Sequence, residues 1–276
     1  MQPVENVQEA RVIANYAALC RFFGGRFSHG RVVNTPELEL VVTDFRHPVA
    51  NVVSRTSWLD DLPDAVVRAR VEMTLQVFAQ RSVPVCWRVW PSTTPASLAS
   101  HLLAVGFVRE VGDPGMTLDL RTWQMPAPVP AGLRIEQIAD AASQQVWVDT
   151  LIAGFGFPDH IRPMMREVAA AMGASAPFTN YLGWHENVPV AVASAFVHDG
   201  VAGIYNVAPL ASARRMGIGA AVTAQALQQA REQGCHTAML LSSEMGLPVY
   251  QRLGFTICCT VEDYIWYPAD MRRTPE

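Results

Sequence analysis

Residues 201–220, VAGIYNVAPLASARRMGIGA, constrain the fold of this 276-residue chain more than any other stretch. The first seven residues are typical of a strand, and Pro209 opens a segment that favours turns. From Ala220 to Gln233 the chain has the composition of a helix. Arginines and glycines therefore lie where a strand passes into the N-terminus of a helix, and the sequence predicts a strand–loop–helix unit there.

This junction has the chemistry of an anion site. The N–H groups in the first turn of a helix have no partner within the helix, and the helix dipole adds positive potential. Gly217 and Gly219 let the backbone approach a phosphate closely and adopt φ values that a side chain disfavours. The guanidinium groups of Arg214 and Arg215 can each bond two phosphate oxygens. The alternative is an ordinary strand–loop–helix connection with incidental glycines. Motifs elsewhere in the sequence are needed to distinguish it from an anion site.

Composition narrows the class of protein. Half of the residues are apolar and 17% are charged, which is typical of chains with packed cores. The net charge of −4 argues against non-specific nucleic-acid binding, which needs a basic surplus. Five cysteines without a zinc-binding spacing indicate reduced thiols and predict no metal. Because the sequence has neither a signal peptide pattern nor an apolar run of about 20 residues, we expect a cytoplasmic protein without membrane contact.

Apolar periodicity and turn residues divide the chain into helices and strands. We expect helices over 5–24, 62–81, 95–107, 140–156, 159–172, 220–233 and 247–255. We expect strands over 38–44, 49–55, 83–90, 107–111, 116–120, 133–138, 178–184, 189–197, 201–208, 237–243 and 256–267. The prolines of residues 121–132, together with the lack of apolar periodicity, predict an exposed, semi-extended linker.

The two halves of the chain echo each other. Each ends in a strand, a short helix closed by a Gly-Phe pair, and a further strand; the pair is Gly106-Phe107 in the first half and Gly254-Phe255 in the second. In place of the arginine–glycine loop, the first half has residues 57–64, SWLDDLPD, with three acids and no glycine. Such a loop would repel a pyrophosphate. We therefore predict a duplicated fold whose first half has lost the anion site.

Residues 133–267 resemble the GNAT superfamily of acyl-CoA N-acyltransferases. The resemblance rests on Arg214-x-x-Gly217-x-Gly219, on the helix and the strand TAMLLSS that follow, and on Tyr250-x-x-Leu253-Gly254-Phe255. It implies an α/β fold with a mixed, splayed sheet and helices on both faces, here duplicated in tandem. Residues 1–120 would then be a degenerate partner domain that walls the acceptor site or mediates homodimerisation, 121–132 a linker and 133–276 the catalytic domain.

The resemblance also implies a reaction and roles for single residues. Acetyl-CoA would lie between the strands at 201–208 and 237–243, and a small primary amine would attack its thioester directly. The backbone N–H of Val207 or Ala208 would stabilise the oxyanion, and Tyr250 would protonate the leaving thiolate. The remaining cofactor contacts implied are Arg214, Arg215, Met216, Gly217, Ile218, Gly219, Ala220 and Ser243.

Several assignments stay open at the level of the sequence. The strands at 189–197 and 201–208 contain no Glu or Asp, so a general base would have to be His198, Asp199, Glu244 or a chain of water molecules. Tyr250 could instead be a core aromatic residue. Phe155, Phe157 and Trp147 suggest either an apolar wall of the acceptor site or ordinary core.

Two other functions compete with this interpretation. A dinucleotide-binding unit would also place Gly-x-Gly after a strand, but Val222 occupies its third glycine position and 178–208 is expected to form three consecutive strands. A GNAT-like module that binds acyl-CoA without catalysing transfer is the second alternative, and an intact Tyr250 argues against it.

Overall fold

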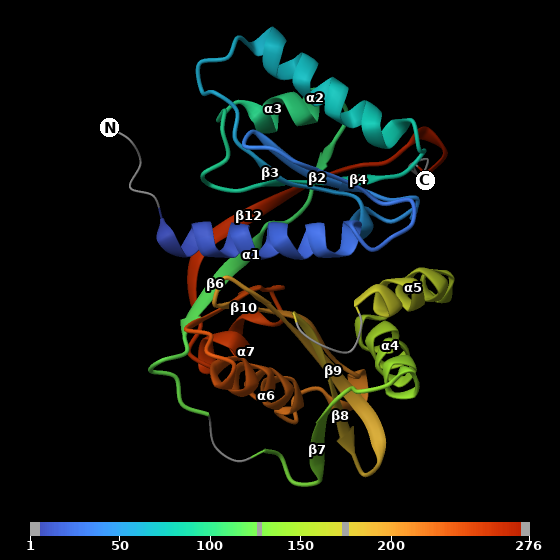
Figure 1. Cartoon of the computed structure of the whole chain (residues 1–276), viewed down its shortest axis with the longest axis vertical. Coiled ribbons are helices and arrows are strands. Elements are labelled where there is room, and N and C mark those ends of the chain that lie inside the picture. The colour runs from blue at the N-terminus through green and yellow to red at the C-terminus, as the bar shows by residue number, and fades with distance from the viewer. Residues whose placement is uncertain (1–5, 126–128, 173–176, 272–276) are drawn as a thin grey trace. The chain divides into compact units, whose positions relative to one another are not determined.

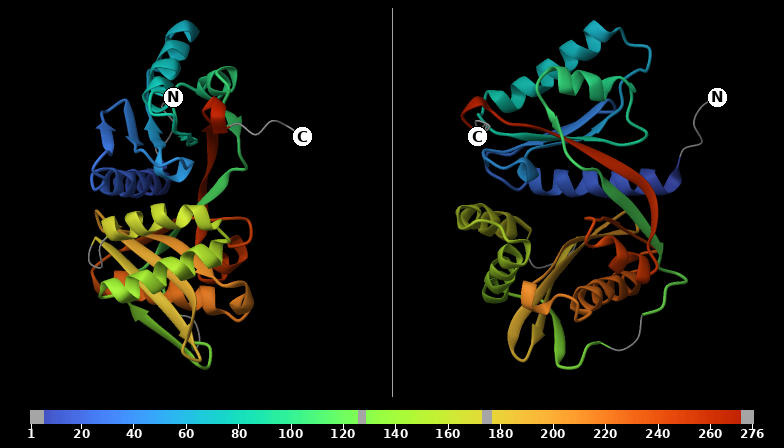
Figure 2. Two further views of the ribbon diagram at one scale, coloured as in Figure 1. Left: turned by 90° about the vertical axis from the view of Figure 1, so that its right-hand side faces the viewer. Right: turned by 180° about the vertical axis from the view of Figure 1, so that it is seen from behind.

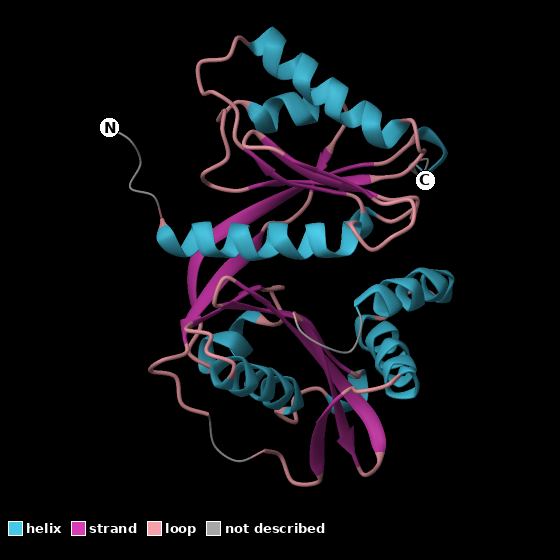
Figure 3. Cartoon of the chain, viewed as in Figure 1, coloured by secondary structure: helices cyan, strands magenta, loops and turns pink. Residues whose placement is uncertain are grey.

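The computed structural model describes residues 6–125, 129–172 and 177–271. They form two compact units: unit 1 contains Met1–Asn15 and Pro114–Cys258, and unit 2 contains Tyr16–Asp113 and Cys259–Glu276. In each unit, helices flank a sheet (Figure 1; Figure 3). No helix in the described part of the chain is both long enough and apolar enough to cross a membrane.

The predicted helices and strands are all present, with their ends shifted by a few residues. The α-helices are α1 Val7–Gly24, α2 Asp64–Ala79, α3 Leu98–Ala104, α4 Ala141–Phe155, α5 Arg162–Met172, α6 Ile218–Glu232 and α7 Leu247–Arg252. The strands are β1 Arg31–Asn34, β2 Leu38–Val42, β3 Val52–Thr56, β4 Val85–Val89, β5 Val108–Arg109, β6 Asp113–Asp119, β7 Leu133–Gln137, β8 Phe178–His185, β9 Val188–His198, β10 Val201–Pro209, β11 Thr237–Leu241 and β12 Thr256–Trp266. Strand β1 was not predicted, because its four residues carry too little alternation.

The sheet of unit 2 has the strand order β1-β2-β3-β4-β12, and β5 also pairs with β12. Strands β3 and β4 are parallel and are connected through α2, while the other pairs are antiparallel. Helices α2 and α3 cover the same face (Figure 1), where Phe78, Trp87 and Leu102 are fully buried. A right-handed helical crossover between parallel strands is the usual way to join them.

The sheet of unit 1 has the strand order β6-β11-β10-β9-β8-β7. Among these described strands only β10 and β11 are parallel, and they are connected through α6. Helix α6 buries Val222 and Leu227 against one face, and α4 and α5 lie on the opposite face (Figure 2). This confirms the mixed α/β fold with helices on both sides of the sheet.

The compact units do not follow the predicted boundaries at 120 and 133. Strand β6, expected in the first domain, pairs with β11 of unit 1 through residues such as Leu118 and Ala238. The end of β12, expected in the second domain, pairs with β4 of unit 2. The residues of a strand show which of its faces is buried but not which neighbouring strand it pairs with, so the local pattern could not assign β6 and β12 to a sheet.

The predicted linker is packed in part. The Trp123 side chain is buried, and its indole N–H donates to the carbonyl of Leu253 at 3.0 Å. Arg231 also donates to the Trp123 carbonyl at 2.8 Å. Residues 126–128 of this segment lie outside the described residues. The expectation of an exposed linker is therefore wrong for Trp123, although residues 121, 122, 124 and 125 are exposed, because the Trp123 indole finds both apolar contacts and a hydrogen-bond acceptor there.

Gly203 is the point where α1 approaches strand β10 of unit 1. The buried Asn15 amide donates to the carbonyls of Phe196 and Val201, at 3.3 and 3.0 Å, and its oxygen accepts from Tyr205 at 2.8 Å. A Cβ atom on Gly203 would overlap both the Asn15 oxygen and the Tyr205 ring. Because three hydrogen bonds hold Asn15 in place, this side chain cannot easily move aside.

Gly203→Ala is expected to lower the free energy of unfolding by about 3 kcal/mol, since overpacking forces side chains or backbone to shift. Urea denaturation followed by circular dichroism would measure this loss. Adding Asn15→Ala should recover part of it, because the overlapping oxygen is then gone. An unchanged urea midpoint for Gly203→Ala would contradict the contact between Asn15 and β10.

Candidate active site

Strands β10 and β11 separate part of the way along their length. Their parallel pairing runs from Val201 opposite Thr237 to Gly203 opposite Met239 and then stops. Strand β10 nevertheless continues to Pro209, and β11 continues to Leu241. The two strands therefore present unpaired backbone toward each other at their C-terminal ends, as expected for a splayed sheet.

A β-bulge lies in the separated part of β10. Tyr205 pairs with Ser194 and Ala208 with Val192, so two residues of β10 face the single residue Ala193 of β9. The extra residues are Asn206 and Val207, and Asn206 has a positive φ of 56°. Asparagine is one of the few residues that adopt this conformation readily. Val207 thus has no cross-strand partner, whereas the other predicted oxyanion donor, Ala208, is paired and buried.

The glycine loop ends in an uncapped helix N-terminus. Gly217 is the N-cap of α6 with a φ of 77°, and among the described residues no side chain hydrogen-bonds to this end of the helix. The first intrahelical bond comes from Ala221, which donates to the Gly217 carbonyl at 3.0 Å. The helix begins at Ile218, two residues before the prediction, because the buried Ile218 side chain anchors its first turn in the core. The N–H groups of Ile218, Gly219 and Ala220 are therefore available to an anion.

The two arginines of the loop differ in their surroundings. The Arg214 guanidinium donates to the carbonyl of Gly154 at 3.2 Å, where α4 ends. A cation at the C-terminus of a helix interacts favourably with its dipole. Arg215 is exposed, has a positive φ of 63°, and forms no ion pair with any described residue. Of the two, Arg215 has the freer guanidinium, and the neighbouring Met216 is 45% exposed.

Tyr250 lies in α7, beside the end of β11. Its half-buried ring packs edge-on against Phe255 with ring centroids 6.0 Å apart, and burial raises the pKa of Tyr250 to about 12. A Cβ atom on Gly246 would lie 2.8 Å from the Tyr250 ring and 3.4 Å from the Ser243 hydroxyl, so the ring lies over this turn. No described residue hydrogen-bonds to the Tyr250 hydroxyl. The Ser243 hydroxyl already accepts from the Gly246 N–H at 3.2 Å.

The candidate bases lie away from the bulge or are solvated. His198 and Asp199 contact each other at 3.3 Å in the turn between β9 and β10, at the opposite end of β10 from Val207. Positive φ values at Asp199 and Gly200 identify this turn as a tight hairpin. Glu244 is exposed, and Ser243 rather than Glu244 bonds the backbone of the following helix.

The aromatic residues of α4 divide between core and surface. Trp147 is fully buried and donates to the carbonyl of Ala193, opposite the bulge, at 3.4 Å. Trp147 is therefore a residue of the hydrophobic core. Phe155 is 49% exposed and lies against Phe157 with ring centroids 5.3 Å apart. The adjacent Gly154 touches Ala208 so closely that a Cβ atom there would lie 2.9 Å from the Ala208 Cβ.

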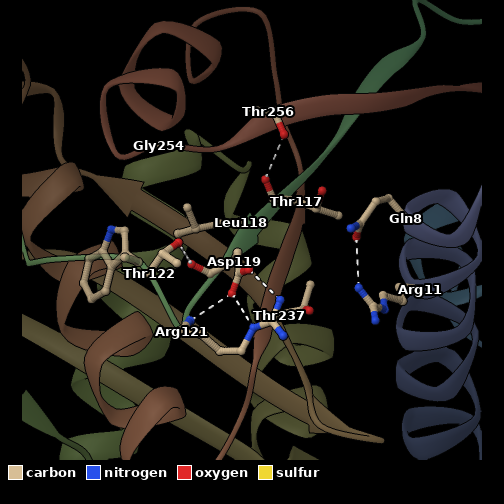
Figure 4. A pocket seen from close by; sticks show the side chains of 11 residues that line it. Gln8, Arg11, Thr117, Leu118, Asp119, Arg121, Thr122, Thr237, Gly254 and Thr256 are labelled. Atoms are coloured by element: carbon tan, nitrogen blue, oxygen red, sulfur yellow. Dashed lines mark hydrogen bonds and ion pairs between the residues drawn. The ribbon is translucent and has the colours of Figure 1, made fainter.

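Unit 1 contains one cavity that lies away from the candidate site and another that borders its glycine loop. One of about 440 Å³ lies at the beginning of β11, between Thr237, Asp119 and Arg11, where hydrogen bonds from Arg121 lower the pKa of Asp119 to about 2 (Figure 4). It lies at the end of β11 remote from Ser243 and is not part of the candidate site. A second cavity of about 230 Å³ lies between α6 and α7 and is bordered by Gly217 and Ala220.

In unit 2 the corresponding strands are held together where β10 and β11 separate. The Trp90 indole donates to the carbonyl of Ser54 at 2.8 Å, and Ser57 forms a parallel bridge with Thr94. The backbone N–H of Trp58 donates to the Thr94 carbonyl at 3.0 Å, and the Thr94 hydroxyl donates to the Trp58 carbonyl at 2.6 Å. These bonds join the backbone of unit 2 at the ends of β3 and β4, at the place that corresponds to the unpaired ends of β10 and β11 in unit 1.

A polar cluster beside the bulge was not predicted from the sequence. The Asn206 amide donates to the Ser194 hydroxyl at 3.1 Å, and Ser194 donates to the Asn180 side-chain oxygen at 2.6 Å. Ser194 and Asn180 are completely buried. The one local signal was an asparagine inside a run of strand-forming residues, since asparagine is depleted in strands and tolerates a positive φ.

Similarity to known proteins agrees with this geometry. Residues 146–255 match the family described as "Acetyltransferase (GNAT) family". A GCN5-related N-acetyltransferase from Kribbella flavida is 24% identical, with 95% of this chain and 98% of that chain covered and a TM-score of 0.70. A tandem GNAT protein from the clavulanic acid biosynthesis pathway is 13% identical over 97% of both chains, with a TM-score of 0.61. No curated protein matches the chain by sequence. The similarity to a tandem protein over nearly the whole chain supports a duplicated fold.

Proposed function

This chain carries a GNAT acetyltransferase domain, and from this premise we propose that it is an acyl-CoA-dependent N-acyltransferase that moves acetyl from acetyl-CoA to a small primary amine. The observation that carries the proposal is the combination of two features. The pairing of β10 and β11 stops at Gly203, and the uncapped N-terminus of α6 follows β10. A long donor with a thioester at one end and a pyrophosphate further along matches both features.

The proposed chemistry needs no covalent enzyme intermediate, because a thioester is already activated. The lone pair of the neutral amine forms the C–N bond, and the carbonyl oxygen takes up the negative charge, which the Val207 N–H stabilises. Collapse of the tetrahedral intermediate breaks the C–S bond. The CoA thiolate takes a proton from Tyr250 as it leaves, and the excess proton of the new amide nitrogen passes through water and restores the Tyr250 hydroxyl.

The proposed cofactor contacts follow the loop. The pyrophosphate would accept hydrogen bonds from the N–H groups of Ile218, Gly219 and Ala220, while Gly217 keeps the approach free of a side chain. Arg215 supplies an exposed cation. We assign Arg214 mainly to holding the end of α4 against the loop, through its bond to Gly154.

We further propose that only unit 1 binds the cofactor and that unit 2 is a non-catalytic partner domain of a cytoplasmic enzyme. The bonds of Trp90 and Thr94 across the strands of unit 2 support this assignment. So do the acidic side chains of Asp60, Asp61 and Asp64, which precede or begin α2 and disfavour a pyrophosphate.

Calorimetric titration with acetyl-CoA is expected to give one site per chain. A stoichiometry of two would show that unit 2 also binds, and no binding at low millimolar acetyl-CoA would refute acetyl-CoA as the donor. Release of free CoA in the presence of a panel of small primary amines would then test transfer. Binding without CoA release for any amine would favour the non-catalytic acyl-CoA-binding alternative.

A further inference from the structure

The bulge turns two consecutive side chains of β10 toward the same face of the sheet. Ala193 and Ala195 of β9 belong to the core that packs on α6, so Ser194 between them projects from the opposite face. Tyr205 pairs with Ser194 and therefore shares that face. Asn206 also reaches Ser194, at 3.1 Å, because its positive φ interrupts the alternation of the strand. The polar side chains of Asn206 and Ser194 therefore lie on the face of the sheet that α4 covers. Asn206 belongs to the part of β10 that is separated from β11.

The hydrogen bonds determine how the Asn206 amide is oriented. The Ser194 hydroxyl has a single proton, which it donates to the Asn180 oxygen at 2.6 Å. Ser194 can then only accept from Asn206, so the amide presents its NH₂ group to Ser194. The Asn206 side-chain oxygen must point away from Ser194. The hydrogen-bonded row of Asn206, Ser194 and Asn180 therefore orients the Asn206 oxygen as an acceptor, and none of these three side chains is charged.

The Asn206 oxygen is unoccupied and reachable. It accepts no hydrogen bond from any described residue, and it is not among the buried polar atoms that lack a partner. Asn206 itself is half-buried, so the oxygen retains contact with solvent. The next residue is Val207, whose N–H is the proposed oxyanion donor. The Asn206 side-chain oxygen and the Val207 N–H therefore belong to adjacent residues of the same bulge. The backbone conformation of the bulge positions both groups.

We propose that the Asn206 side-chain oxygen accepts a hydrogen bond from the N–H of the attacking amine and directs its lone pair at the thioester. The proposal rests on the proposed function and assigns the amine-holding group of that site. A carboxylate is absent from β9 and β10, and an oriented amide oxygen can position a neutral amine in its place. Ser194 is then a positioning residue, which acts through Asn206.

The test compares Asn206→Gly, Asn206→Asp and Ser194→Ala with the unaltered chain. Glycine keeps the positive φ but removes the oxygen, whereas aspartate keeps both. Asn187→Gly is the matched control, because Asn187 has a φ of 62° in the exposed turn between β8 and β9. For each variant, titration calorimetry gives the Kd of acetyl-CoA. CoA release gives kcat/KM for the amine that the unaltered chain acetylates best.

Asn206→Gly is expected to lower kcat/KM for the amine about 10- to 100-fold, with the Kd of acetyl-CoA changed less than about twofold. Ser194→Ala and Asn206→Asp should each lower kcat/KM about 3- to 10-fold, since both keep an acceptor oxygen at residue 206 but lose the hydrogen bond from its NH₂ group to Ser194 that orients it. Asn187→Gly should change neither quantity. Equal losses in acetyl-CoA affinity and turnover, or no loss for Asn206→Gly, would overturn the assignment. No transfer by the unaltered chain would instead refute the proposed function itself.

Discussion

Gly217→Glu is expected to weaken acetyl-CoA binding at least about 100-fold while leaving the protein folded. The carboxylate would stand at the N-terminus of α6, where the pyrophosphate is proposed to bind, and the two anions repel each other. Space is not limiting, because a Cβ atom on Gly217 would have its nearest neighbour, Pro130, at 3.6 Å. A positive φ of 77° costs about 1–2 kcal/mol for a residue with a side chain, but an acid at the N-terminal end of a helix is favourable by about 0.3–1 kcal/mol.

Gly200→Glu is the control for this substitution. Gly200 has a similar φ of 71° and lies in the hairpin between β9 and β10, where a Cβ atom would meet no described atom within 4 Å. Both variants therefore carry the same charge and a similar backbone cost. Titration calorimetry and thermal unfolding should show that only Gly217→Glu loses acetyl-CoA. Equal affinity losses in both variants would mean that backbone strain, and not the anion site, is responsible.

Tyr250→Phe is expected to lower kcat about 10²- to 10³-fold with an unchanged Kd for acetyl-CoA, as is typical of removing a general acid. The ring remains, so its edge contact with Phe255 is kept. Because the pKa of Tyr250 is raised to about 12, its hydroxyl keeps its proton between pH 6 and 10, roughly the range in which most enzymes are assayed. The rate should therefore show no loss from Tyr250 ionisation in that range.

Tyr181→Phe is the matched control for Tyr250→Phe. The Tyr181 hydroxyl donates to Gln229 at 2.7 Å within the core of unit 1. Its removal should cost about 1 kcal/mol of stability and leave kcat unaltered. Stopped-flow or steady-state CoA release separates the two cases. A Tyr250→Phe variant with full turnover would remove Tyr250 from the mechanism.

The elements and the loop of the candidate site could be predicted because their causes are local. Apolar periodicity places α6 and β11, and the positive φ at Gly217 is a property of one residue type. The order of loop, helix, strand and Tyr250 motif then led to a family resemblance, and the match of residues 146–255 agrees with it. The roles of the loop residues and Tyr250 remain predictions that the substitutions above would test.

The hydrogen-bond partners of Asn206 and Arg214 could not be predicted, because they are distant in the sequence. Nothing near Asn206 in the chain indicates that Ser194 and Asn180, which lie 12 and 26 residues before it, complete a hydrogen-bonded row across three strands. Arg214 similarly finds its partner Gly154 at the end of a helix 60 residues away. Such partners are selected by how the strands and helices pack, and periodicity within one element carries no information about them.

The sequence by itself determined the helices, nearly all the strands, the glycine loop and the acidic character of its counterpart at 57–64. Each depends on the φ preference, charge or hydrophobicity of neighbouring residues. The tertiary structure alone decided that β6 pairs with β11 and the end of β12 with β4, and that Trp90 and Thr94 join the strands of unit 2. It also decided that Asn206, beside Val207, presents an oxygen to which no described residue donates. These outcomes depend on which of several compatible surfaces meet, because any strand with suitable alternation can pair and any carbonyl within reach can accept.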